Sequence, residues 1–207
     1  MQQPRDVIEF PIIGEIDAGG WDLRKALLLA LAGNAVVVEW AKAPIVYEEI
    51  PDFRRELIEV LDQIVDPARV AHHYLGLARS HVARIGSLST DVKLKKLFYL
   101  IRPIVALDWM AKRDFSALPP MSLPESVAGA GLTPDVVEAI QSMIAQKAVT
   151  REMGVGPILP AIANYLEARY AHHEANAPRT MPGDIAERRS IAEEFYRRTI
   201  MSGQTRA

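Results

Sequence analysis

The stretch GEIDAGGWDLRKALLLALAGN, residues 14–34, decides the expected fold, because it joins an alternating segment to a strongly amphipathic one. In this stretch Asp17 stands just before Gly19 and Gly20, and glycine adopts the backbone conformations that a sharp turn needs. Residues 21–32 then carry apolar side chains at helical spacing. The stretch therefore predicts a strand-to-helix corner that presents the carboxylate of Asp17.

The flanking segments extend this α/β pattern. Residues 6–17 alternate in polarity and predict a strand whose apolar face is formed by Phe10, Ile12 and Ile16. Downstream, AVVVEWA predicts a second helix, and PIVYE predicts a short strand. This piece is incomplete, because a stable sheet needs roughly three or more strands or a covering partner. We expect a second copy, forming a homodimer, or another chain to cover its apolar face.

Beyond Pro51 the apolar period becomes helical. Six segments show an apolar stripe, at residues 52–65, 66–85, 90–114, 133–149, 157–175 and 183–201. Residues 116–134, which are rich in Pro, Gly and Ser, are expected to form one long connection. The expected fold class is therefore mainly α, a helical bundle that follows a small N-terminal α/β piece.

Composition narrows the function classes. The chain of 207 residues is 49% hydrophobic, contains no cysteine and has a net charge of −2. Disulfides, thiol nucleophiles and thiolate metal sites are thereby excluded, and the net charge provides no global attraction to nucleic acid. No apolar run is long enough to span a bilayer, and the N-terminus MQQPRDVIEF lacks a signal-peptide layout. We expect a cytoplasmic protein with no membrane partner.

A longer run, IDAGGWDLRKALLLALAGNAVVVEWAKAPIVY, resembles nucleotidyltransferases of the DNA polymerase β superfamily, in the branch associated with RNA repair. The resemblance is carried by an acid, a spacer and an aromatic residue before Leu-Arg-Lys, followed by an apolar helix, Gly-Asn, Glu-Trp and Pro-x-Val-Tyr. Two further runs, HHYLGLARS and KLKKLFYLIRPIVALDWM, resemble the family's helical half. The resemblance spans residues 5–110 and fades after Met110.

This resemblance implies transfer of a nucleotide from a nucleoside triphosphate through two magnesium ions, with RNA as the acceptor. It implies that residues 1–50 are the C-terminal part of the nucleotidyltransferase core and that residues 51–207 form the helical domain. The α/β piece is then a remnant of a polymerase-β-like nucleotidyltransferase sheet. Of the three carboxylates that hold the metal ions in the family, Asp17 matches the third, so it is the predicted catalytic residue and metal ligand.

The first two carboxylates of the family pattern, an Asp-x-Asp after Gly-Ser, are missing. The one Gly-Ser in a comparable setting, Gly86-Ser87, is followed by the single acid Asp91. One aspartate cannot hold two magnesium ions, which need shared carboxylates. We therefore expect that Met1 lies inside a longer ancestral reading frame and that the chain as written does not catalyse transfer.

Lys95, Tyr99 and Arg102 recur at spacing i, i+4 and i+7, so they share one stripe of a predicted helix. A Lys and an Arg beside a Tyr ring suit the binding of a triphosphate, and the resemblance implies the same role. These three are the predicted nucleotide-binding residues, and we expect them to point toward the strand end that carries Asp17. The alternative is that they form the solvated flank of a core helix.

Two further expectations concern the surroundings of Asp17. Glu15 shares the same face of the predicted strand and is a candidate second acid, although a solvated strand residue is the simpler interpretation. The large rings of Trp21, Trp40 and Trp109 are expected to pack in the core.

The adjacent pairs His72-His73 and His172-His173 point about 100° apart on a helix, which disfavours chelation of a metal ion. Each pair follows an arginine by three or four residues, a spacing that fits the Arg-plus-His motif of helical ribonucleases poorly. The alternative function, from a different class, is a non-catalytic helical binding or interaction module that retains the family scaffold.

Overall fold

The computed structural model describes residues 6–86, 88, 91–149, 154–180 and 185–204. These residues form nine helices and two sheets of two strands each, so the predicted fold class, mainly α with a small strand remnant, is confirmed. None of the helices in these ranges is long and apolar enough to cross a membrane.

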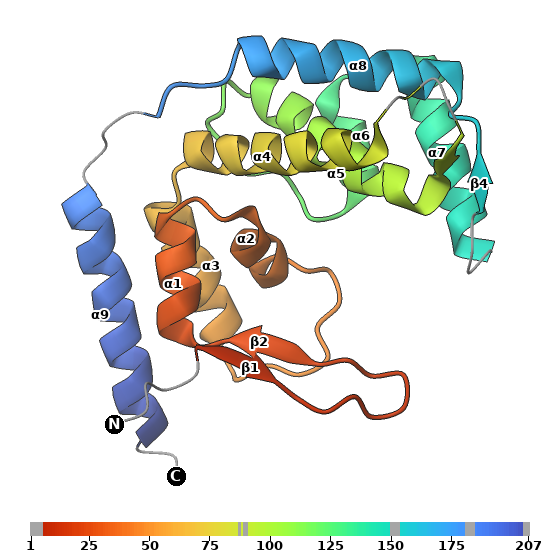
Figure 1. The fold of residues 1–207 in the computed structure, drawn as a ribbon. Helices are drawn as coiled ribbons and strands as arrows, with labels where there is room; N and C mark the ends of the chain where they lie inside the picture. The colour runs from red at the N-terminus through yellow and green to blue at the C-terminus, as the bar shows by residue number, and fades with distance from the viewer. Residues whose placement is uncertain (1–5, 87, 89–90, 150–153, 181–184, 205–207) are drawn as a thin grey trace. The chain divides into compact units, whose positions relative to one another are not determined.

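The chain divides into two compact units, which are described separately (Figure 1). The first unit comprises Met1–Ala41, Tyr47–Asp66 and Pro182–Ala207, and the second comprises Lys42–Val46 and Pro67–Met181. This grouping reflects compactness. Compactness does not test where a nucleotidyltransferase core ends, so the predicted division of the chain at residue 50 stays a prediction.

A β-hairpin begins the first unit. Strand β1 (Val7–Glu9) pairs antiparallel with β2 (Gly19–Trp21), with Val7 opposite Trp21 and Glu9 opposite Gly19. The prediction of one strand over residues 6–17 followed by a glycine turn is therefore wrong. The chain reverses earlier, at Gly14, whose positive φ of 63° suits glycine. Both arms of a hairpin alternate in polarity, so the sequence pattern concealed the reversal.

The strand-to-helix corner follows β2 and carries Asp22. Helix α1 (Leu23–Leu31) begins at Asp22, whose carboxylate accepts a hydrogen bond of 2.9 Å from the backbone N–H of Lys25. Asp17 instead lies on the returning arm of the hairpin, before β2. The expectation that Asp17 occupies the corner is thus corrected, because an N-cap aspartate takes that place.

Three more helices complete the first unit: α2 (Ala35–Ala41), α3 (Phe53–Ile64) and α9 (Ile185–Gln204). In Figure 1 the C-terminal α9 runs alongside α1 and α3. Phe195 of α9 is only 2% exposed, and its ring stacks on Phe53 of α3 at a centroid distance of 6.1 Å. An ion pair of 3.0 Å between Arg198 and Glu56 joins the same two helices.

The short strand expected in PIVYE is absent, since residues 44–48 adopt neither helix nor strand. All five residues are exposed and pair with no strand of the described chain. A strand this short is stable only when a neighbouring strand accepts its backbone hydrogen bonds.

The second unit is built around α5 (Leu94–Ala111), eleven of whose residues are buried. It packs against α4 (Pro67–Ile85), α6 (Leu123–Ala130) and α8 (Pro160–Ala175), and α7 (Pro134–Val149) packs against α6 and α8. Two short strands, β3 (Val92–Lys93) and β4 (Val155–Gly156), pair antiparallel. Helices α4, α5, α7 and α8 agree with the segments that the apolar period predicted.

Helix α6 lies inside the segment that was expected to be a long connection, and this expectation is corrected. The Ser122 side chain caps α6 by accepting from the N–H of Glu125, and Gly131 ends it with a positive φ of 76°. Val127 and Ala130 are buried against the core. A helix of eight residues shows too few turns for its apolar period to stand out among Pro, Gly and Ser.

Candidate functional site

Asp17 lines an open hollow of about 580 Å³ on the hairpin of the first unit. The same hollow is lined by Glu9 of β1, by Trp21 of β2 and by Trp40 of α2. The two indole rings stack with their centroids 4.4 Å apart, and Trp40 is half exposed, so the expectation that these tryptophans lie in the core is wrong for this pair. The arrangement offers two carboxylates beside an exposed aromatic surface.

The acid that shares this hollow with Asp17 is Glu9, and the predicted candidate Glu15 is not among the lining residues. Glu9 was missed because its partnership with Asp17 arises only when the two arms of the hairpin lie together. Two carboxylates alone do not fit a two-magnesium site, which needs several shared acids. Among the described residues no group of three His, Cys, Asp or Glu side chains is placed to hold a metal ion.

The three predicted nucleotide-binding residues lie in the second unit. Lys95, Tyr99 and Arg102 are all on α5, with Lys95 and Tyr99 exposed and Arg102 half-buried. Arg102 donates a hydrogen bond of 3.3 Å to the backbone carbonyl of Met121. Because Asp17 belongs to the first unit, the idea that the four residues form one site stays a prediction.

A residue that the sequence did not single out lies against this face of α5. The ring of His81, on α4, stacks on Tyr99 with centroids 5.6 Å apart and planes 19° apart. Burial lowers the pKa of His81, and the nearby charge of Arg84 lowers it further, so the ring is mainly neutral at pH 7. The stack places the Tyr99 ring against His81, on the same face of α5 as Lys95 and Arg102.

A second polar cluster in the same unit surrounds the buried carboxylate of Asp108 on α5. Three side chains of α8 lie 2.7 Å from its oxygens: the hydroxyl of Tyr165, Nε of Arg169 and Nε2 of His173. Burial raises the pKa of the Asp108 carboxyl, but the three hydrogen bonds outweigh burial, so the pKa lies below its usual value. Asp108 is therefore ionised at neutral pH.

The phenol of Tyr165 keeps its proton in this cluster. Burial raises the pKa of Tyr165, and the charge of Asp108 raises it further, so the hydroxyl donates to the carboxylate. The sequence feature that could have identified this cluster is the single acid Asp108 in the apolar run IRPIVALDWM. The helical period places Asp108 at a core position, where an ionised side chain needs partners.

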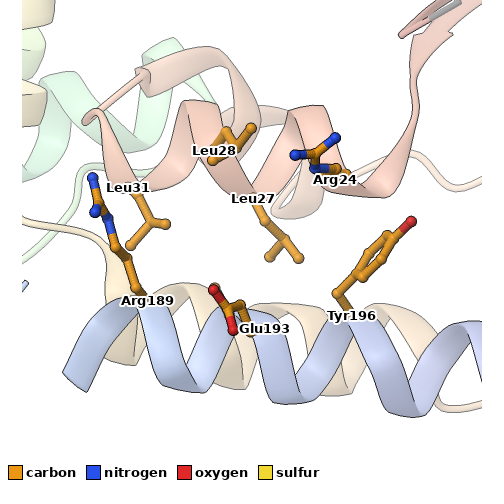
Figure 2. Close-up of a pocket in the computed structure, with 8 residues that line it drawn as sticks. Arg24, Leu27, Leu28, Leu31, Arg189, Glu193 and Tyr196 are labelled. Carbon is orange, nitrogen blue, oxygen red and sulfur yellow. The ribbon is translucent and has the colours of Figure 1, made fainter. Parts of the chain in front are cut away.

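A separate groove of about 310 Å³ lies between α1 and α9 in the first unit. Figure 2 shows Leu27 and Leu31 pointing from α1 toward α9, which carries Glu193 and Tyr196. None of the predicted site residues lines this groove, so it is not part of the candidate site.

Comparison with known proteins supplies a family. The family described as RlaP, RNA repair pathway DNA polymerase beta family, matches residues 1–197. The match runs through the C-terminal helices, so the expectation that the resemblance fades after Met110 is wrong. The uncharacterized protein YcgL of Bacillus subtilis (strain 168) is 30% identical over 167 residues, which cover 81% of this chain and 63% of that protein. The chain therefore spans less than two thirds of the relative's length. No solved structure matches significantly.

Proposed function

Since the chain belongs to the RNA repair pathway DNA polymerase beta family, we propose that it is part of a metal-dependent nucleotidyltransferase that uses a nucleoside triphosphate. The observation that carries this proposal is the family match over residues 1–197, which includes the helix of Lys95 and the hairpin of Asp17. The family description names RNA repair, so we propose RNA as the acceptor. The absence of cysteine suits action in the cytoplasm.

Asp17 contributes one carboxylate to magnesium binding in this proposal. Two magnesium ions would supply the clamp on the attacking and leaving oxygens of an in-line displacement. The hollow provides Asp17 and Glu9, and the described residues do not complete the set of ligands. The 207-residue chain by itself is therefore proposed to be inactive in transfer.

Lys95, Tyr99 and Arg102 hold the phosphates of the nucleotide in this proposal. The exposed ammonium of Lys95 and the guanidinium of Arg102 lie on one side of α5, which suits a polyanion. Tyr99 stands between them and stacks on the ring of His81.

We expect the isolated chain to bind a nucleoside triphosphate weakly in the presence of magnesium and to release no pyrophosphate. Lys95→Gln should weaken this binding about fivefold, because it removes a charged partner of the phosphates. Calorimetric titration measures the binding, and a pyrophosphate assay of the same samples measures turnover. Lys96→Gln is the matched control, because Lys96 is also exposed at the start of α5.

Turnover that Asp17→Asn abolishes would contradict the proposed inactivity. Equal affinities of Lys95→Gln, Lys96→Gln and the unchanged chain would remove the α5 face from the proposal. The pyrophosphate assay tests the role of Asp17, and the calorimetric titration tests the role of Lys95.

The second candidate function is a non-catalytic interaction module, and the exposed hairpin favours it. Phe10, Ile12 and Ile16 lie on the hairpin between β1 and β2, where they are 60%, 69% and 68% exposed, and the sheet that this hairpin forms has two strands. Such a sheet is marginal on its own, and its unpaired edges can accept another strand. We propose a second copy of this chain as the partner, with the two hairpins covering each other.

Self-association through the hairpin is expected at high protein concentration. Ile12→Lys should weaken it strongly, because full burial of one such side chain is worth about 1.5–3 kcal/mol. Sedimentation equilibrium measures the change, and Ile45→Lys is the control, since Ile45 is exposed to a similar extent (66%) in the second unit. A strictly monomeric chain at the highest concentrations would contradict this proposal.

A further inference from the structure

An open pocket of about 360 Å³ lies beside the Asp108 cluster in the second unit. Its polar lining residues come from four places along the chain: Asp108 on α5, Lys112 just after α5, Thr133 just before α7, and Tyr165 and Arg169 on α8. A volume of this size is at the small end of ligand-binding pockets. The pocket thus has room for a small polar group.

Asp108 holds Arg169 in a fixed orientation at this pocket. Both Nε and Nη2 of Arg169 lie 2.7 Å from Oδ1 of Asp108, and the carboxylate is only 5% exposed. A guanidinium carries five N–H donors, so two of these contacts leave several donors unused. Arg169 has no other acceptor within the described part of the chain, and its side chain is 33% exposed.

Lys112 brings a second cation to the pocket. Its ammonium lies close to Gly131, where a Cβ atom would come within 3.2 Å of Nζ. Gly131 also has a positive φ of 76°, a conformation that favours glycine at this position. Among the described residues Lys112 has no carboxylate partner.

Among the charged residues that line the pocket, the cations outnumber the carboxylates. Asp108 is balanced by Arg169, which leaves the charge of Lys112 in excess even without counting His173, the remaining partner of Asp108. The hydroxyl of Thr133 is engaged by the carboxyl of Asp135, a residue that is not among those lining the pocket. An anion entering the pocket would meet one ammonium and the unused donors of one oriented guanidinium.

We propose that this pocket binds a phosphate group, held by Lys112 and by the N–H donors of Arg169 that Asp108 leaves free. A phosphate presents several acceptor oxygens, so it can bridge a guanidinium and an ammonium at once, and such charge-assisted bonds are the strong ones. Asp108 acts as a positioning residue, because it orients Arg169 and does not itself contact the anion.

This site is separate from the predicted nucleotide-binding face of α5. Lys95 and Lys112 are 17 residues apart, which corresponds to about 25 Å along a helix. The proposal therefore does not rest on the proposed transfer activity, and a variant at Lys112 tests it without touching Lys95 or Asp17.

The test is a titration of the full ¹⁵N-labelled chain with inorganic phosphate, followed by NMR, with sodium chloride at matched ionic strength as the reference. Saturable shifts are expected at the backbone amides of Lys112, Gly131 and Thr133. Lys112→Gln should weaken binding about tenfold. Because Lys112 is exposed, this variant is expected to keep its fold, which thermal unfolding checks. Lys96→Gln should bind phosphate like the unchanged chain.

A second arm with adenosine monophosphate distinguishes the source of the phosphate group. Equal affinity for the two ligands indicates that the pocket recognises inorganic phosphate. Tighter binding of adenosine monophosphate indicates that it recognises the phosphate of a nucleotide. Shifts that do not saturate, or equal affinities of Lys112→Gln and the unchanged chain, would overturn the proposal. Neither result would affect the expectation for Lys95, which concerns triphosphate binding at the other end of α5.

Discussion

Replacing Asp108 by asparagine is expected to destabilise the second unit by about 3 kcal/mol, because it breaks a buried ion pair by removing one partner. The lower end of the usual range applies, since Arg169 is 33% exposed and water can partly solvate its charge. The amide would also present a donor to groups that now donate to the carboxylate. Native-state hydrogen exchange at the amides of α5 in urea measures the change for this unit.

Asp91→Asn is the matched control for this prediction, because Asp91 is an exposed aspartate of the same unit. It should change the free energy of unfolding by less than about 0.5 kcal/mol. A similar loss in both variants would mean that the Asp108 cluster contributes no special stability.

The effect of Asp108→Asn should depend on pH. The pKa of Asp108 is lowered in the folded chain, so the ionised carboxyl contributes stability at pH values above its unfolded pKa of about 3.9. This contribution is lost as the pH falls through the lower folded pKa. The difference between Asp108→Asn and the unchanged chain is therefore expected to be full at pH 7 and to shrink below about pH 4.

Phe195→Ala is expected to destabilise the first unit by about 3–5 kcal/mol, the usual cost of removing a buried phenylalanine ring. Phe195 is nearly fully buried and stacks on Phe53, so its loss leaves a cavity between α9 and α3. Since a chain of two compact units need not unfold in one step, hydrogen exchange at the amides of α3 is the appropriate measurement. Protection there should fall, while protection in α5 should stay unchanged.

Ile200→Ala on the same helix is the control, because its side chain is 43% exposed. This variant is expected to lower the free energy of unfolding of the first unit by much less than Phe195→Ala does. If Phe195→Ala left the exchange of α3 unchanged, α9 would not be an integral part of the first unit.

The hairpin and the helix that follows it were predictable from the sequence only in part. The alternation over residues 6–17 was read as one strand because both arms of a hairpin share the same period. The helical spacing predicted over residues 21–32 agrees with the end of α1 at Leu31, and the chain then turns at Gly33, whose positive φ of 83° glycine adopts easily. Helix α1 starts at Leu23 with Asp22 as its N-cap, whereas the sequence pattern favoured Asp17 as the carboxylate at this corner. Local signals thus placed the helix but assigned its corner carboxylate to the wrong residue.

The long helices, the mainly α class and the family resemblance follow from the sequence alone, because helical period and short motifs are local properties of the chain. Which groups from distant parts of the chain lie in contact follows from the packing of the helices. Asp108 finds its partners 57, 61 and 65 residues away, and Arg198 of α9 pairs with Glu56 across 142 residues. These pairings depend on how the helices pack. The apolar period of one segment shows which of its faces is buried, but it does not show which other segment covers that face.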